Sequence, residues 1–193
     1  MKRYSFCPVC GRPYGRRDAG VEDSRVHLCS SCGFEFWQNS KPAVGALVTR
    51  VVDGKPQVLL TRRGIEPCKG MWDFPGGFLD NGELPEAGLA RELDEELGIS
   101  IARPRLFSLG IDEYPAESAA WDARFVLSLY YRCEIPPQAG IAAADDVAEA
   151  AWFALDELPA ELAFASNKRA LADLLTSWRN ESTGATGGTA GSG

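Results

Sequence analysis

Three glutamates near the end of one predicted helix carry the clearest chemical signal in the sequence. Because successive helical residues turn by about 100°, Glu92, Glu95 and Glu96 share an arc of about 100°. Carboxylates are disfavoured at a helix C-terminus, where the macrodipole is already negative, and at these spacings they also repel one another. Mg²⁺ or Mn²⁺ would relieve both effects, because these ions bind oxygen ligands. The pattern therefore predicts metal-assisted hydrolysis of a phosphoryl or pyrophosphate group.

The helix that presents these glutamates is predicted to run from Pro85 to Leu97. Pro85 suits a first helical turn, and Gly98 suits a left-handed stop. A separate stripe can bury the helix against a sheet, and it consists of Leu89, Leu93 and Leu97. A solvated acidic face is the alternative interpretation, but lysine is absent from residues 76–100, so no lysine neutralises that face.

Two Cys-x-x-Cys pairs near the N-terminus predict a metal site of a different kind. Each pair is followed by a glycine, which lets a tight knuckle close, and eighteen residues separate the pairs. Four thiolates complete a tetrahedral shell, so the ion should be structural; zinc is expected, and iron is the alternative. His27, the only histidine, is then not needed as a ligand. We expect a zinc ribbon over residues 1–38 with the ligands Cys7, Cys10, Cys29 and Cys32.

Short aliphatic runs after the cysteine pairs are typical of strands, and the first two flank the turn sequence DGKP, which predicts a hairpin. Leucines at helical spacing predict a closing helix. The expected elements are strands at 43–52, 57–63, 105–111, 124–135 and 150–155, and a helix over 166–178. This order predicts a mixed α/β domain over residues 39–179, with the chemistry where the first helix meets the sheet. A flexible tail is expected over residues 180–193.

The charge distribution argues against a nucleic-acid partner. The net charge is −7, and the first 50 residues hold eight Lys/Arg against four Asp/Glu, so the remainder carries −11. An acidic main domain would repel a polyanion. No apolar run approaches the roughly 20 residues that span a bilayer, so no membrane partner is expected. The N-terminus lacks the apolar stretch of a secretory signal, which predicts a cytoplasmic location.

The spacing around the acidic helix resembles the Nudix box at every specified position. Gly77, then Glu83, then the run from Arg91 to Ile99 match that box, and the resemblance extends over residues 40–180. The N-terminal ribbon is similar to that of zinc-ribbon Nudix hydrolases, which include NADH, FAD and ADP-ribose pyrophosphatases. The resemblance implies a Nudix-type α/β/α sandwich that cleaves the pyrophosphate of a nucleoside diphosphate linked to another group.

The same resemblance implies roles for individual residues. The three glutamates would bind Mg²⁺ or Mn²⁺, helped by a backbone carbonyl at Gly76 or Gly77. Arg91 would orient Glu92, and Glu83 would support the loop and helix. A further carboxylate from a distant loop is expected at Asp146 or its neighbour Asp145, with the competitors Glu113, Glu117 and Glu149. Aromatic side chains that could stack on a base are Phe36, Trp37, Trp72 and Tyr114, with burial in the core as the alternative for each.

The resemblance also ranks the substrates. NADH pyrophosphatases carry a Ser-Gln-Pro-Trp-Pro-Phe-Pro stretch after the box, and this chain has GIDEYPAESAAWD instead. Pro115, sixteen residues after Ile99, is typical of ADP-ribose-cleaving members. ADP-ribose or FAD is therefore expected, ahead of NADH and nucleoside triphosphates. A ribbon that binds nucleic acid or protein beside a regulatory Nudix domain is the alternative of another class, and a homodimer is expected by similarity.

Overall fold

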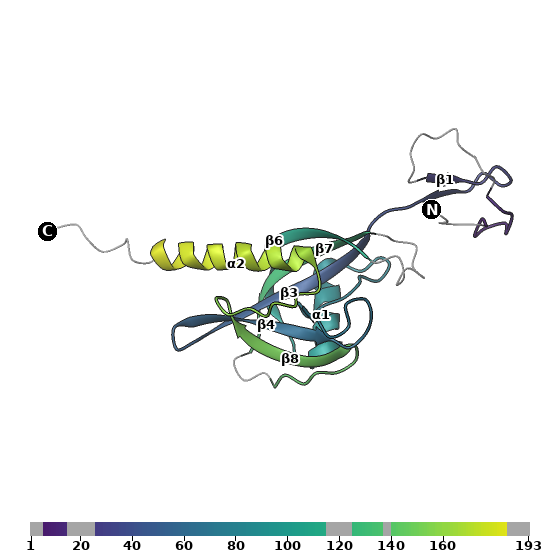
Figure 1. Ribbon diagram of the computed structural model, residues 1–193. Coiled ribbons are helices and arrows are strands. Elements are labelled where there is room, and N and C mark those ends of the chain that lie inside the picture. The colour runs from purple at the N-terminus through teal and green to yellow at the C-terminus, as the bar shows by residue number, and fades with distance from the viewer. Residues whose placement is uncertain (1–5, 15–25, 115–124, 137–139, 185–193) are drawn as a thin grey trace.

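The computed structural model describes residues 6–14, 26–114, 125–136 and 140–184 (Figure 1). A small antiparallel pair is formed by β1 (Val26–Leu28) and β2 (Glu35–Trp37), and it lies apart from the main sheet. The remaining elements are β3 (Lys41–Val52), β4 (Lys55–Arg63), β5 (Trp72–Asp73), α1 (Pro85–Leu97), β6 (Ala102–Glu113), β7 (Phe125–Glu134), β8 (Val147–Ala154) and α2 (Ala165–Gly184).

The main sheet is mixed, and β3 joins its two parts. Strands follow the order β5-β4-β3-β7-β6, and β8 pairs with β4. The first part of β3 pairs in parallel with β7, from Lys41 to Val48, and its last residues form the predicted hairpin with β4. The other pairings are antiparallel. One strand thus carries the chain from one half of the sheet to the other and anchors both.

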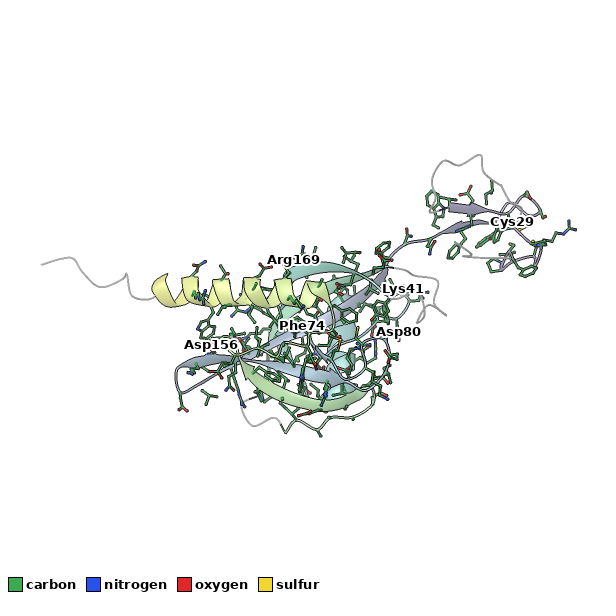
Figure 2. All side chains as sticks on the ribbon, viewed as in Figure 1. Cys29, Lys41, Phe74, Asp80, Asp156 and Arg169 are labelled. Atoms are coloured by element: carbon green, nitrogen blue, oxygen red, sulfur yellow. The ribbon has the colours of Figure 1, made fainter. Side chains whose placement is uncertain are left out.

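Side chains alternate along the strands and build a core on each face of the sheet. On one face, Leu89, Leu93 and Leu97 of α1 pack with Val44 and Val48 of β3, all of them buried. On the other face, α2 packs over a second cluster that includes Leu47, Phe74, Tyr130, Leu171 and Leu174. Figure 2 shows Phe74 in the interior of this layer. Helices on opposite faces give the α/β/α sandwich that the resemblance implied.

Most predicted elements are confirmed with small shifts. Helix α1 has the predicted bounds, and Gly98 adopts the left-handed conformation with φ 65°. The hairpin turn is shorter than predicted: Asp53 and Gly54, both with positive φ, form it alone, and Pro56 belongs to β4. The boundary between the closing helix and the tail was predicted wrongly, because α2 continues to Gly184. Residues 185–193 lie outside the described part of the chain. No helix in the described ranges is long and apolar enough to cross a membrane.

Candidate active site

The loop before α1 lies against β3 and brings the helix to the sheet. The amide of Val44 donates to the carbonyl of Gly77 at 2.9 Å, and the amide of Ala46 donates to Pro75 at 2.9 Å. A side chain at Gly76, which has φ 140°, would place its Cβ 2.2 Å from the carbonyl oxygen of Val44. Glycine is therefore required at this close approach. In this position the amide of Gly76 donates a hydrogen bond to Glu96 Oε2 at 2.8 Å.

Arg91 ties the acidic side chains of the helix to the preceding loop. Its Nη1 donates to Glu92 Oε1 and to Glu95 Oε2, each at 2.9 Å. Its Nε and Nη2 donate to the two carboxylate oxygens of Glu83, each at 3.0 Å, and Nη2 also reaches the carbonyl of Phe78. These hydrogen bonds lower the pKa of Glu83. Arg91 therefore contacts Glu83, Glu92 and Glu95 directly, and the roles that the resemblance implied for Arg91 and Glu83 stay predictions.

Burial makes two of the three glutamates poor places for a lone negative charge. Glu96 is only 8% exposed, and burial raises its pKa to about 8, partly offset by the amide of Gly76. Burial also raises the pKa of Glu92, against the lowering effect of Arg91. Glu95 is half exposed. Glu96 accepts a hydrogen bond from the amide of Gly76, but it forms no ion pair with another described residue. A bound cation would supply the missing positive charge.

All three glutamates line one cavity of about 500 Å³, within the range of ordinary ligand sites. Gly76 and Gly77 line it too, so oxygen donors surround its acidic end, and Mg²⁺ or Mn²⁺ fits this donor set. The carboxylate oxygens of the three glutamates do not all lie within 4.8 Å of one another. Among the described residues, only the four cysteines are gathered that closely. Arg91 holds two of the three glutamates, so Glu92 and Glu95 would have to turn from Arg91 toward a shared ion. The carbonyl of Gly77 already accepts one hydrogen bond from β3 and retains a second lone pair.

The loop before β8 brings Asp145 and Asp146 to the same cavity. The carbonyl of Asp146 accepts from the amide of Gly64 at 2.7 Å, which fixes this loop beside the end of β4. Both aspartates are exposed. Glu149 lies outside the cavity and pairs with Arg62 at 3.7 Å. Glu113 does not line the cavity either, and Glu117 falls outside the described residues.

The four aromatic candidates have different surroundings. Tyr114 lines the cavity and stacks on Phe164, with ring centroids 5.4 Å apart and planes at 16°. Trp72 instead packs edge-on against Phe153 in the core under α2. Phe36 and Trp37 line a second hollow beside the loop from Leu79 to Glu83. The structure therefore brings Tyr114 into the cavity that the glutamates line and does not bring the other three there.

Several cavity residues have no counterpart among the candidates from sequence. Arg63 ends β4, Asp73 ends β5, and Phe164 directly precedes α2. Arg63 Nη1 donates to Asp73 Oδ2 at 3.0 Å, and the guanidinium carbon lies 5.4 Å from the Phe164 ring centre. Nothing in the local sequence distinguishes these three residues. They are recognised only from the structure, in which the ends of β4 and β5 and the segment before α2 meet at the cavity.

The four cysteines converge as predicted. Their sulfurs all lie within 4.8 Å of one another, at the end of the β1–β2 pair, where Figure 2 labels Cys29. Gly11 and Gly33 adopt positive φ and donate to the carbonyls of Cys7 and Cys29, which closes each knuckle. Cys7 and Cys29 are buried, and the other two are exposed. Such a cluster is compatible with one tetrahedral zinc ion. Cys133, by contrast, lies in the core.

Comparison with known proteins supports the same assignment. The family model described as NUDIX domain matches residues 40–174. The chain is 29% identical over 174 residues to the NAD-capped RNA hydrolase NudC of Stutzerimonas stutzeri, with 90% of this chain and 56% of that protein covered. It therefore spans a little over half the length of this curated relative.

Solved structures agree with the family match. A MutT NUDIX hydrolase from Burkholderia pseudomallei is 28% identical, with a TM-score of 0.58 over 70% of this chain and 98% of the other. A NUDIX hydrolase from Nitrosomonas europaea shares the fold, with 24% identity, a TM-score of 0.66 and coverage of 87% and 88%. The acidic helix, the loop against β3 and the family match over residues 40–174 show that this chain belongs to the Nudix hydrolase family.

Proposed function

We propose that this chain hydrolyses the pyrophosphate linkage of a nucleoside diphosphate joined to a second group, with Mg²⁺ or Mn²⁺. One observation carries the proposal: Glu92, Glu95 and Glu96 line a single cavity beside the Gly76–Gly77 loop, and Glu96 is buried there with a raised pKa. A buried carboxylate of this kind is stabilised as an anion by a divalent cation. The cavity is also large enough for a nucleotide.

The protein groups would divide the work in this cavity. Bound divalent ions would lower the pKa of the attacking water and offset charge on the phosphates. Glu92, Glu95 and Glu96 would hold those ions, with the amide of Gly76 fixing the orientation of Glu96. Arg91 would limit the positions of Glu92 and Glu95 through its two contacts. Asp146, from the loop before β8, is the proposed distal carboxylate because it lines the same cavity.

ADP-ribose or FAD is the proposed substrate class. Support comes from GIDEYPAESAAWD, which stands where NADH pyrophosphatases carry their own stretch, and from Pro115. NAD and NADH form the second candidate, because the relative named above is an NAD-capped RNA hydrolase. The absence of a nucleic-acid partner, a cytoplasmic location and a homodimer stay predictions from sequence and resemblance.

A substrate panel tests the proposal directly. ADP-ribose, FAD, NAD, NADH, a nucleoside triphosphate and NAD-capped RNA are incubated with the protein and Mg²⁺ or Mn²⁺, and products are separated by chromatography. We expect AMP with a phosphorylated partner, formed fastest from ADP-ribose or FAD. Faster cleavage of NADH or capped RNA would overturn the substrate class and leave the reaction intact. RNA binding without hydrolysis of any compound would favour the binding-module alternative.

Matched variants on one helix connect the activity to the site. Glu95→Gln and Glu96→Gln should each lower kcat by about 100-fold or more, since even groups that only support metal ligands contribute 10- to 100-fold. Asp94→Asn is the control, because Asp94 is exposed on the same helix and does not line the cavity. Equal kcat in all three variants would reject the assignment of the glutamates.

A further inference from the structure

One tyrosine beside the four-cysteine cluster carries a buried polar atom that has no partner. The hydroxyl oxygen of Tyr14 is buried, and it forms no hydrogen bond with the described residues. The rest of the side chain is half-buried. Buried side-chain polar atoms are nearly always hydrogen-bonded in folded proteins, because an unpaired one costs stability. This hydroxyl is therefore a donor for which the loaded ribbon should supply an acceptor.

The backbone places Tyr14 on the same side of the first knuckle as Cys7. Phe6 and Pro13 form an antiparallel bridge, and the amide of Cys7 donates to the carbonyl of Arg12 at 2.8 Å. Cys7 therefore lies opposite Arg12. Because side chains two residues apart share a face of a strand, Tyr14 and Cys7 are diagonal neighbours on one face. An aromatic side chain is long enough to span such a diagonal.

Two further rings hold Tyr14 against the strands of the ribbon. The Tyr14 ring lies 6.0 Å from the His27 ring between centroids, with an angle of 51° between the planes. His27 lies 6.2 Å from the ring of Phe36, its direct partner in the β1–β2 pair. The three rings join the first cysteine knuckle to both strands, so Tyr14 is fixed beside the cluster.

The sulfurs of the cluster are the charged groups that the hydroxyl faces. All four lie within 4.8 Å of one another, and those of Cys7 and Cys32 are 3.7 Å apart. Burial and the neighbouring thiolates of Cys7, Cys29 and Cys32 together raise the pKa of Tyr14 to about 12. The hydroxyl therefore keeps its proton at neutral pH and remains a donor.

We propose that the Tyr14 hydroxyl donates a hydrogen bond to the Cys7 thiolate when zinc is bound, which makes Tyr14 a positioning residue for the metal site. The inference goes beyond the proposed function and rests on the four-cysteine zinc site. Four thiolates around one divalent ion leave an excess of negative charge. A donor to one ligating sulfur offsets part of that charge and fixes the direction of the sulfur lone pairs.

Tyr14→Phe tests the hydrogen bond, because it removes the hydroxyl and keeps the ring. The zinc affinity of the full reduced chain is measured by competition with a chromophoric chelator. We expect it to fall by about 10- to 100-fold, as for other lost hydrogen bonds to metal ligands. Tyr131→Phe is the matched control, since the Tyr131 hydroxyl donates to Glu86 of α1 at 3.2 Å in the main domain. Its zinc affinity should equal that of the wild type.

The sign of the effect separates this hydrogen bond from a hydroxyl that is only buried. Removing a buried hydroxyl that has no acceptor would leave the zinc affinity unchanged or raise it, because an unpaired donor would be lost. Either result for Tyr14→Phe would overturn the proposal.

Cobalt provides a second measurement that packing of the ring does not affect. In the Co²⁺-substituted protein, the thiolate-to-cobalt charge-transfer band should move to longer wavelength in Tyr14→Phe. The reason is that the sulfur loses the hydrogen bond that lowers the energy of its lone pairs. A lower zinc affinity with an unchanged band would show that Tyr14 acts only through packing of the ribbon, and it would also reject the hydrogen bond.

The zinc site and the hydrogen bond fail in different ways. If the wild type binds no zinc, the cluster is not a zinc site and the proposal falls with it. If the wild type binds about one zinc per chain with an affinity that Tyr14→Phe leaves unchanged, the site stands and the hydrogen bond is wrong. Neither result decides the hydrolysis, because the four cysteines do not line the cavity of the glutamates.

Discussion

Among single residues, Glu96 is the clearest case of a group placed where the isolated protein disfavours its charge. Its pKa is raised to about 8, from the ordinary value of 4.5, chiefly because it is buried. Between these two values the folded protein binds more protons than the unfolded chain. The contribution of Glu96 to the free energy of unfolding should therefore be greatest below about pH 4.5. It should be lost as the pH rises through 8.

This direction gives a measurable pH dependence. Urea unfolding without added Mg²⁺ or Mn²⁺ should show stability declining from pH 5 to pH 8, with Glu96 contributing at most about 1.4 kcal/mol per pH unit. Glu96→Gln should reduce that slope without abolishing it, because burial also raises the pKa of Glu92 and Asp73. Added Mg²⁺ should restore stability at pH 8 in the wild type more than in the variant. Identical slopes in the two proteins would contradict the burial argument.

Among the elements, the loop from Pro75 to Gly77 determines where α1 meets the sheet. Gly76→Ala would place a methyl group against the carbonyl of Val44 and force the loop away from β3. The amide that bonds Glu96 would move with it. We expect this variant to lose both stability and most of its kcat.

The control for this element is Gly82→Ala in the same connection. Gly82 also has positive φ, but an added Cβ would meet no atom within 4 Å. Its cost should be limited to backbone strain of about 1–3 kcal/mol, with kcat largely retained. Thermal unfolding and steady-state kinetics on both variants check this, and similar losses of kcat would show that the contact with Val44 is unimportant.

Across the whole molecule, the strands beside the four cysteines and the strands beside the glutamates form two separate sheets. Strands β1 and β2 pair with each other, and the main cavity is lined by residues between 43 and 164. Metal analysis should find about one zinc per chain, and Cys7→Ser with Cys29→Ser should lose it while keeping most of the kcat. Cys68→Ser should retain zinc, since Cys68 lies in the loop after β4 and donates to the carbonyl of Ala163. A double variant that keeps its zinc and stability would exclude the four-cysteine site.

Local patterns predicted the elements well where the stop signals were strong. Pro85 and Gly98 bracket α1 because proline and left-handed glycine act within one turn of the chain. The end of α2 had no such signal near Trp178, and the polar residues after it resembled a tail. Glu181 stays helical through contacts with Ser177 and Arg132, at 2.9 and 2.8 Å. Arg132 belongs to β7, so this extension depends on tertiary packing.

The sequence by itself determined the acidic helix and the four-cysteine cluster, because both depend on the spacing of residues within short segments. It also determined the family, through Gly77, Glu83 and the run from Arg91 to Ile99. Only the tertiary structure decided which of the aromatic candidates lines the cavity of the glutamates, and that Arg63 and Phe164 line it too. The reason is that these residues come from separate strands and loops, whose meeting point depends on strand order and on the packing of α2.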